Sequence, residues 1–108
     1  MVNKYNAKRT YSELCQRWFA SKLEAKRGEQ LRLMEMAGEI GILKYQIPFV
    51  LSKNPKITVT IDFFYVKPLE GGIYEDAKGV LTRDSRTKYA WLEQKLGIKV
   101  KLVNKEAL

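Results

Sequence analysis

Residues 57–66, with the sequence ITVTIDFFYV, give the clearest strand signal in the chain. β-branched and aromatic side chains dominate this stretch, and both kinds favour extended structure. Because side chains alternate along a strand, its odd-numbered apolar residues share one face and Asp62 lies on the other. An acidic group in such a strand is costly to bury alone, so we expect Asp62 to be exposed, paired or a ligand.

Turn signals on both sides of this strand predict an antiparallel unit. Residues 42–51 form an extended segment in which Pro48 favours an edge position or a bend. A turn at residues 52–56 joins this segment to the central strand. On the other side, residues 67–72 form a glycine-containing connection to a further strand at about 73–80.

Capping signals predict two helices around the strands. The sequence SKLE at residues 21–24 has the S-x-x-E form of a capping box, and Gly38 supplies a stop. In the second helix Asp84 or Ser85 is the expected cap and Gly97 the expected stop. The predicted order is a helix (22–37), three strands (42–51, 57–66, 73–80), a helix (85–96) and a strand (98–103). This order predicts an α/β fold with a mixed central sheet.

Length and composition restrict the function. The 108 residues suffice for one domain spanning 1–108, and polar, aperiodic residues 1–10 predict a flexible basic arm. The absence of histidine excludes Ser-His-Asp triads and histidine-ligated metals, and the single Cys15 excludes disulfide frameworks. No apolar run approaches the ~20 residues of a membrane span. Carboxylates that hold a hard cation such as magnesium are the commonest solution left for an enzyme.

The charge indicates nucleic acid as the leading partner class. A net charge of +8 and a pI near 9.6 attract polyanions, although a well-charged surface alone would also explain them. The residues that we expect to contact nucleic acid are Lys8, Arg9, Arg27, Thr82, Arg83, Arg86 and Lys88. For Arg27, on the apolar arc of the first helix, a core ion pair is an equal alternative. Trp91 lies opposite the apolar seam of the second helix, so we expect it to stack on a ligand or to lie under a partner subunit.

Three polar residues are expected to converge on one side of the sheet. Asp76 and Lys78 are two residues apart on a predicted strand and therefore share a face. Asp62 on the neighbouring strand faces the same side, whereas Glu75 faces the opposite side and serves as an internal control. Two carboxylates together with phosphate oxygens satisfy the coordination that magnesium requires. Lys78 can orient an attacking water and stabilise charge on the phosphate.

These motifs resemble those of the PD-(D/E)xK nuclease superfamily. The matching stretches are FASKLEAKR around Glu24, IDFFY around Asp62 and YEDAKG around Asp76 and Lys78. With MAGEI and YQIPF, they are similar to small phage-encoded Holliday junction resolvase-like proteins over residues 18–103. Ile61 stands where the motif name has proline.

The resemblance implies a restriction-endonuclease-like core with four catalytic residues. It assigns Glu24, Asp62 and Asp76 as metal ligands and Lys78 as the catalytic lysine. Glu24 also has a purely structural alternative, because it is the N3 residue of the capping box.

We therefore expect an endonuclease that uses Mg²⁺, or alternatively Mn²⁺, to activate water for attack on DNA phosphodiesters. Its small size favours recognition of shape, as in branched DNA, and two paired cuts favour a homodimer. The expected location is the cytoplasm of a phage host, without membrane contact. Two alternatives remain open: a phage nickase or single-strand nuclease, and a non-catalytic basic DNA-binding recombination accessory.

Overall fold

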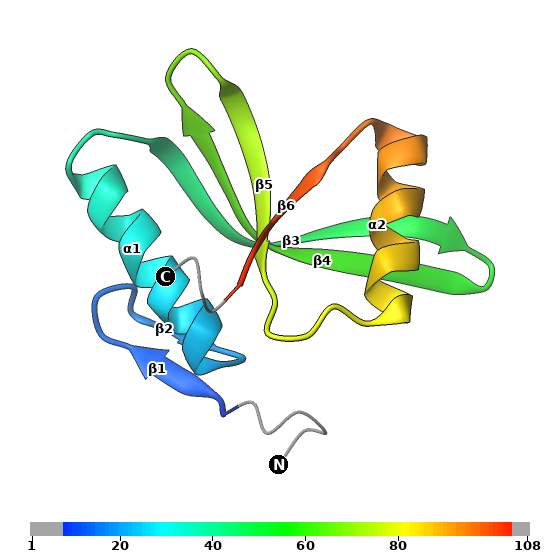
Figure 1. Ribbon diagram of the computed structural model, residues 1–108, viewed down its shortest axis with the longest axis horizontal. Coiled ribbons are helices and arrows are strands. Elements are labelled where there is room, and N and C mark those ends of the chain that lie inside the picture. Colours follow the sequence, from blue (N-terminus) through cyan, green and yellow to red (C-terminus); the bar gives the residue numbers. More distant parts are fainter. Residues whose placement is uncertain (1–7, 105–108) are drawn as a thin grey trace.

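The computed structural model describes residues 8–104, which form an α/β fold with two helices and two sheets (Figure 1). The elements in chain order are β1 (Thr10–Ser12), β2 (Arg17–Phe19), α1 (Lys22–Met36), β3 (Gly41–Lys53), β4 (Lys56–Lys67), β5 (Gly71–Ala77), α2 (Arg83–Leu96) and β6 (Val100–Val103). The predicted order of helix, three strands, helix and strand is confirmed from α1 to β6. The sequence pattern does not predict β1 and β2, and Thr10, at the end of the predicted arm, already belongs to β1. Residues 1–7 of that arm lie outside the described residues.

The larger sheet is mixed, with the strand order β3-β4-β5-β6. Antiparallel pairing joins β3 to β4 and β4 to β5, whereas β6 pairs parallel to β5 after the chain has passed through α2. The edge position of β3 confirms the interpretation of Pro48. Within residues 8–104, neither helix has the length and apolar character needed to cross a membrane.

Helix α1 begins and ends where its capping signals predict. The Ser21 hydroxyl accepts a hydrogen bond from the Glu24 N–H at 3.1 Å, and Gly38 follows the helix with a φ of 79°. Close packing depends on Gly28, because a Cβ at this position would lie only 2.7 Å from the Phe19 ring. The small residue therefore lets α1 approach the aromatic core.

Helix α2 begins two residues earlier than predicted. Its N-cap is Thr82, whose hydroxyl accepts a hydrogen bond from the Ser85 N–H at 3.1 Å, so the expected caps Asp84 and Ser85 lie within the first turn. Gly97 ends the helix with a φ of 70°, as predicted. Trp91 is half-buried and packs within the chain against the apolar residues beneath α2, so it forms part of the core.

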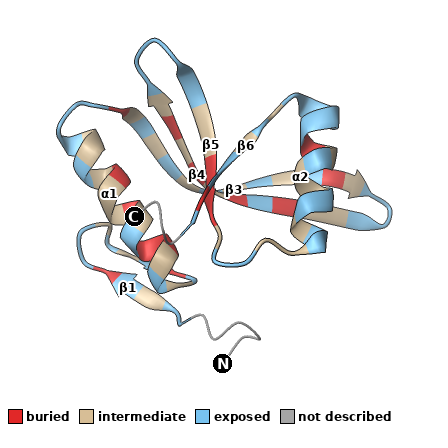
Figure 2. Ribbon diagram, in the orientation of Figure 1, coloured by how far each residue is buried: buried red, intermediate tan, exposed pale blue. Residues whose placement is uncertain are grey.

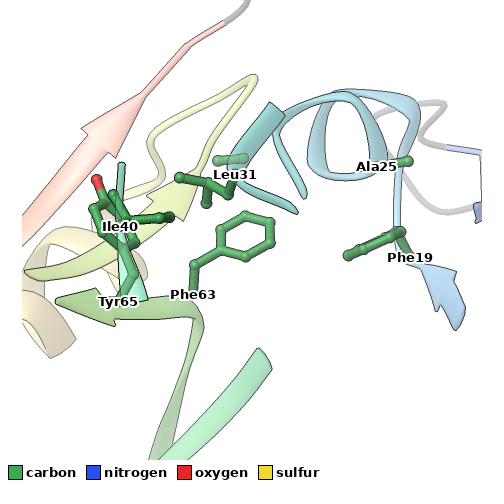
Figure 3. Close-up of a cluster of buried hydrophobic side chains, with 7 residues drawn as sticks. Phe19, Ala25, Leu31, Ile40, Phe63 and Tyr65 are labelled. Atoms are coloured by element: carbon green, nitrogen blue, oxygen red, sulfur yellow. The ribbon is translucent and has the colours of Figure 1, made fainter. Parts of the chain in front are cut away.

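The hydrophobic core is divided into two clusters that share β4. One cluster packs against α1 and includes Phe63 and Tyr65 of β4 (Figure 3). The other contains Val59 and Ile61 of β4 together with Leu92 of α2. Figure 2 shows buried residues gathered on the strands and on the inner sides of the helices. Asp62 lies between Ile61 and Phe63, at the point where the two clusters separate.

Candidate active site

Asp62 and Asp76 meet across the neighbouring strands β4 and β5. The Asp62 N–H donates to Asp76 Oδ1 at 2.6 Å, and the Ala77 N–H donates to Asp62 Oδ2 at 3.0 Å. Each carboxylate therefore binds the backbone of the opposite strand. The alternation of side chains along β4 and β5 predicts that the two carboxylates lie close together, and the hydrogen bonds fix both side chains in place.

Tyr89 of α2 engages the remaining oxygen of Asp76. Its hydroxyl donates a short hydrogen bond to Asp76 Oδ2. Burial, followed by the bond to Asp76, raises the pKa of Tyr89 above its usual range, so the phenol stays protonated as a donor. The helical pattern places Tyr89 on an apolar seam and gives no sign of this polar contact. Asp76, only 1% exposed, has both oxygens in hydrogen bonds within the protein.

Glu24 is linked to Asp62 through Gln46 of β3. The Gln46 side-chain amide lies 3.2 Å from Glu24 Oε2 and 3.4 Å from Asp62 Oδ1. Gln46 has a φ of 53°, a conformation that is uncommon for residues other than glycine. The YQIPF stretch contains Gln46, but a polar residue on an edge strand carries no further signal of function. Sequence reasoning therefore misses this bridging residue.

The clustered carboxylates repel one another. Burial, followed by the charges of Asp76 and Glu24, raises the pKa of Asp62 to about 8. Burial is also the main cause of the raised pKa of Glu24, which shares a hydrogen bond with Asp62. At neutral pH the pair therefore holds a proton, which a cation would displace. Lys78 opposes the rise in the pKa of Asp62 by its positive charge.

Lys78 lies one residue beyond the end of β5, because the strand stops at Ala77 and not near residue 80 as predicted. Its N–H donates to the Val103 carbonyl oxygen at 3.0 Å, which anchors this segment to β6. The side chain of Lys78 lines a cavity of about 300 Å³ next to Asp76. The other residues that line this cavity are Thr58, Val59, Thr60, Asp84, Ser85, Lys88 and Tyr89.

Arg27 and Glu75 form a buried ion pair away from this cluster. Arg27 Nε lies 2.6 Å from Glu75 Oε2, and Arg27 Nη2 donates to Glu75 Oε1 at 2.9 Å. Tyr65 adds a hydrogen bond from its hydroxyl to Glu75, which is fully buried. Arg27 therefore forms the core ion pair that the sequence offered as an equal alternative to a nucleic-acid contact. Glu75 points away from the acidic cluster, as its role of internal control requires.

The other basic residues expected at nucleic acid lie in two places. Lys8 and Arg9 are exposed immediately before β1, and Arg83 and Arg86 are exposed on the first turns of α2. Lys88 is half-buried and lines the cavity, where it also pairs with Asp84 at 3.4 Å. Thr82 serves as the N-cap, so its hydroxyl already has a structural role.

A magnesium ion at this cluster would need ligands from its substrate in addition to the carboxylates of the protein. Within residues 8–104 no group of three or more acidic, histidine or cysteine side chains is arranged to hold a metal ion by itself. Magnesium, however, is usually bound through one or two carboxylates, with waters and substrate phosphate oxygens as its remaining ligands. Glu24 and Asp62, on either side of the Gln46 amide, provide such a pair, and Asp76 adjoins it.

The fold and the site together define an α/β protein with an acidic cluster next to a lysine-lined cavity. No family model matches this chain, and no curated protein or solved structure matches it either. The geometry of the site is therefore the basis for assigning a function.

Proposed function

We propose that the protein is a magnesium-dependent endonuclease that hydrolyses DNA phosphodiesters. The observation that carries the proposal is the meeting of Glu24, Asp62 and Asp76 beside the cavity lined by Lys78. The element order from α1 to β6 agrees with a restriction-endonuclease-like core, and the quoted motifs agree with the PD-(D/E)xK superfamily. The finer fold and family assignments are part of the same proposal.

Each residue of the cluster has a distinct task in this reaction. Bound magnesium, or manganese in its place, would activate water and offset charge on the attacked phosphate. Glu24 and Asp62 provide the negative charge that holds the cation. Asp76 fixes the backbone of Asp62, and Lys78 stabilises the charge that develops on the phosphate oxygens.

The surroundings of the cluster suit a phosphate backbone. Lys78 and Lys88 line a cavity to which Ser85 and two threonines also contribute, and Lys88 pairs there with Asp84. Arg83 and Arg86 extend the positive charge along α2. Phosphate contacts of this kind position DNA without reading its sequence. We therefore infer recognition by shape, as in branched DNA, by a homodimer that presents two sites.

Cleavage assays with matched variants test the proposal. Purified protein should nick plasmid and cut a four-way junction in Mg²⁺ but not in EDTA. Asp76→Asn and Lys78→Ala should lower cleavage at least about 100-fold while leaving DNA binding nearly unchanged. Glu70→Gln and Lys67→Ala change an exposed ion pair at the β4–β5 turn and should cleave normally. Full activity of both site variants would refute the assignment.

A non-catalytic DNA-binding module is the second candidate. The observation that favours it is the full engagement of Asp76, whose two oxygens accept hydrogen bonds from Asp62 and Tyr89. In that case the acidic cluster has only a structural role. Salt-sensitive DNA binding without cleavage in Mg²⁺ or Mn²⁺ on duplex, single-stranded and junction DNA would favour this second function.

A further inference from the structure

Two aromatic rings lie side by side on the outer face of the β1–β2 hairpin. Tyr11 and Trp18 are directly opposite each other across the strands, with ring centroids 5.3 Å apart in an edge-on arrangement. Tyr11 is 47% exposed and Trp18 is 53% exposed. The neighbouring residues Ser12 and Phe19 are buried, so the hairpin attaches to the rest of the protein by its opposite face. The two exposed rings are therefore not required for that attachment.

Positive charge lies next to this aromatic pair. The Arg9 guanidinium lies over the Trp18 ring, 5.0 Å from its centroid, and Lys8 is also exposed. Glu13 is the acidic residue of the hairpin, and it lies in the turn beyond the paired positions. Exposed aromatic rings with adjacent arginine and lysine are the combination that binds unpaired nucleotides, because every base has a face that stacks. The charge and the rings together favour a nucleic-acid strand over an apolar protein surface.

The hairpin is also close to the acidic cluster. β2 leads directly into α1, and the backbone of Ala20 in this connection hydrogen bonds with the Glu24 carboxylate. Glu24 is six positions after Trp18, so at most about 22 Å of chain lies between them. Figure 1 shows β1 and β2 beside α1, on the side of the molecule away from α2. If a phosphate of a DNA strand lies at the acidic cluster, bases a few nucleotides away on that strand can therefore reach the two rings.

We propose that Tyr11 and Trp18 form a stacking platform for unpaired bases of the DNA strand next to the phosphate to be cut. This proposal rests on the proposed nuclease function and specifies its substrate class. The substrate is DNA in which a duplex adjoins unpaired nucleotides, as at a branch point or a single-stranded tail. Arg9 contributes to the platform by its contact with the Trp18 ring and by its charge.

Binding measurements in EDTA test the platform independently of cleavage. The probes are a fluorescent duplex with a short single-stranded tail and the same duplex with blunt ends. Trp18→Ala and Tyr11→Ala should each weaken binding of the tailed probe on the order of 10-fold and leave blunt-duplex binding within about 2-fold. Trp18→Phe, which keeps a ring, should restore most of the affinity. Leu69→Ala removes a fully exposed apolar side chain in the β4–β5 turn and should change neither affinity.

Tryptophan fluorescence provides a second measurement. Trp91→Phe leaves Trp18 as the reporter, and the tailed probe should quench its emission whereas the blunt probe should not. Preferential binding of the tailed probe that persists in a Tyr11→Ala/Trp18→Ala double variant would overturn the platform. A loss of self-association in that variant, with unchanged DNA affinity, would assign the rings to a second copy of the chain and also overturn it. Absence of Mg²⁺-dependent cleavage, with tail-selective binding retained, would overturn the nuclease function alone.

Discussion

Among the single residues of the site, Asp62 carries an electrostatic cost in the absence of a cation. Burial and the neighbouring carboxylates raise its pKa from 3.8 to about 8. Between these two values the folded protein holds a proton that the unfolded chain has lost. The stability of the folded state therefore falls as pH rises through this window and then levels off. A carboxylate that carries such a cost is a candidate for a function that needs its charge.

Replacement of Asp62 by asparagine is expected to stabilise the metal-free protein. The asparagine oxygen can still accept the hydrogen bond from the Ala77 N–H, but the repulsion is removed. At pH 8 the gain in unfolding free energy should be at least about 1.4 kcal/mol, the equivalent of one pKa unit. Near pH 4 the difference should disappear, because the wild-type carboxyl is then neutral in the folded state. Urea unfolding in EDTA measures both values, and a variant that is less stable at pH 8 would contradict the repulsion.

Gln46 is expected to act by positioning the two carboxylates that it bridges. Gln46→Gly removes the amide, and glycine adopts the φ of 53° freely, so the fold should be retained. The Mg²⁺ concentration for half-maximal cleavage should rise about 10- to 100-fold, as for other residues that orient metal ligands. Ile42→Gly is the matched control, because Ile42 lies on the same strand with the same φ. Equal Mg²⁺ dependence of the two variants would remove Gln46 from the site.

At the scale of elements, the contact of α1 with the strands depends on its small residue. A Cβ at residue 28 would lie 2.7 Å from Phe19 Cζ and 3.3 Å from Phe63 Cε1, and both rings are buried. Gly28→Ala should therefore destabilise the protein by about 1–3 kcal/mol through overpacking, in spite of the better helix propensity of alanine. Gly79→Ala, which has no heavy atom within 4 Å of its added Cβ, should change stability far less. Equal urea midpoints for the two variants would contradict this account of the packing.

The elements that the sequence predicts correctly are those with local signals. The caps of α1, the alternation of β4 and the stop at Gly97 all depend on residues close together in the chain. The hairpin β1–β2 has only three residues in each strand, too few for a periodic pattern, and it gains stability by burying Phe19 against α1. Pairing it from the sequence would require knowledge of that packing.

The acidic cluster, too, is predictable only where its contacts follow from residues that are close in the chain. The alternation of side chains along strands is enough to predict that Asp62 and Asp76 lie close together, because their strands are neighbours in the chain. Gln46 and Tyr89 join them from β3 and α2, and both contacts depend on how the elements pack in three dimensions. Arg27 is a further case, since its helical position is compatible with a nucleic-acid contact or a core ion pair, and only the fold identifies Glu75 as its ion-pair partner.

For the whole molecule, the proposed function makes the distribution of charge the property that would decide how DNA is held. The chain has a net charge of +8, and its expected phosphate contacts lie on two sides of the central strands. Lys8 and Arg9 lie before β1, whereas Arg83 and Arg86 lie on α2, which is separated from β1 in Figure 1. A duplex that contacts both groups would pass the central strands, which carry the acidic cluster. The total charge alone would hold DNA equally well in any orientation.

The salt dependence of binding distinguishes a fixed DNA path over these basic groups from binding through net charge alone. Each phosphate contact with duplex DNA contributes about 0.9 to the slope of log affinity against log salt concentration. Arg83→Ala/Arg86→Ala should therefore lower the slope by about 1.8. The control Lys53→Ala/Lys56→Ala removes the same charge from the tip of the β3–β4 hairpin and should lower the slope much less. Equal losses would mean that binding follows the net charge of the molecule, and the duplex would then have no fixed path over the acidic cluster.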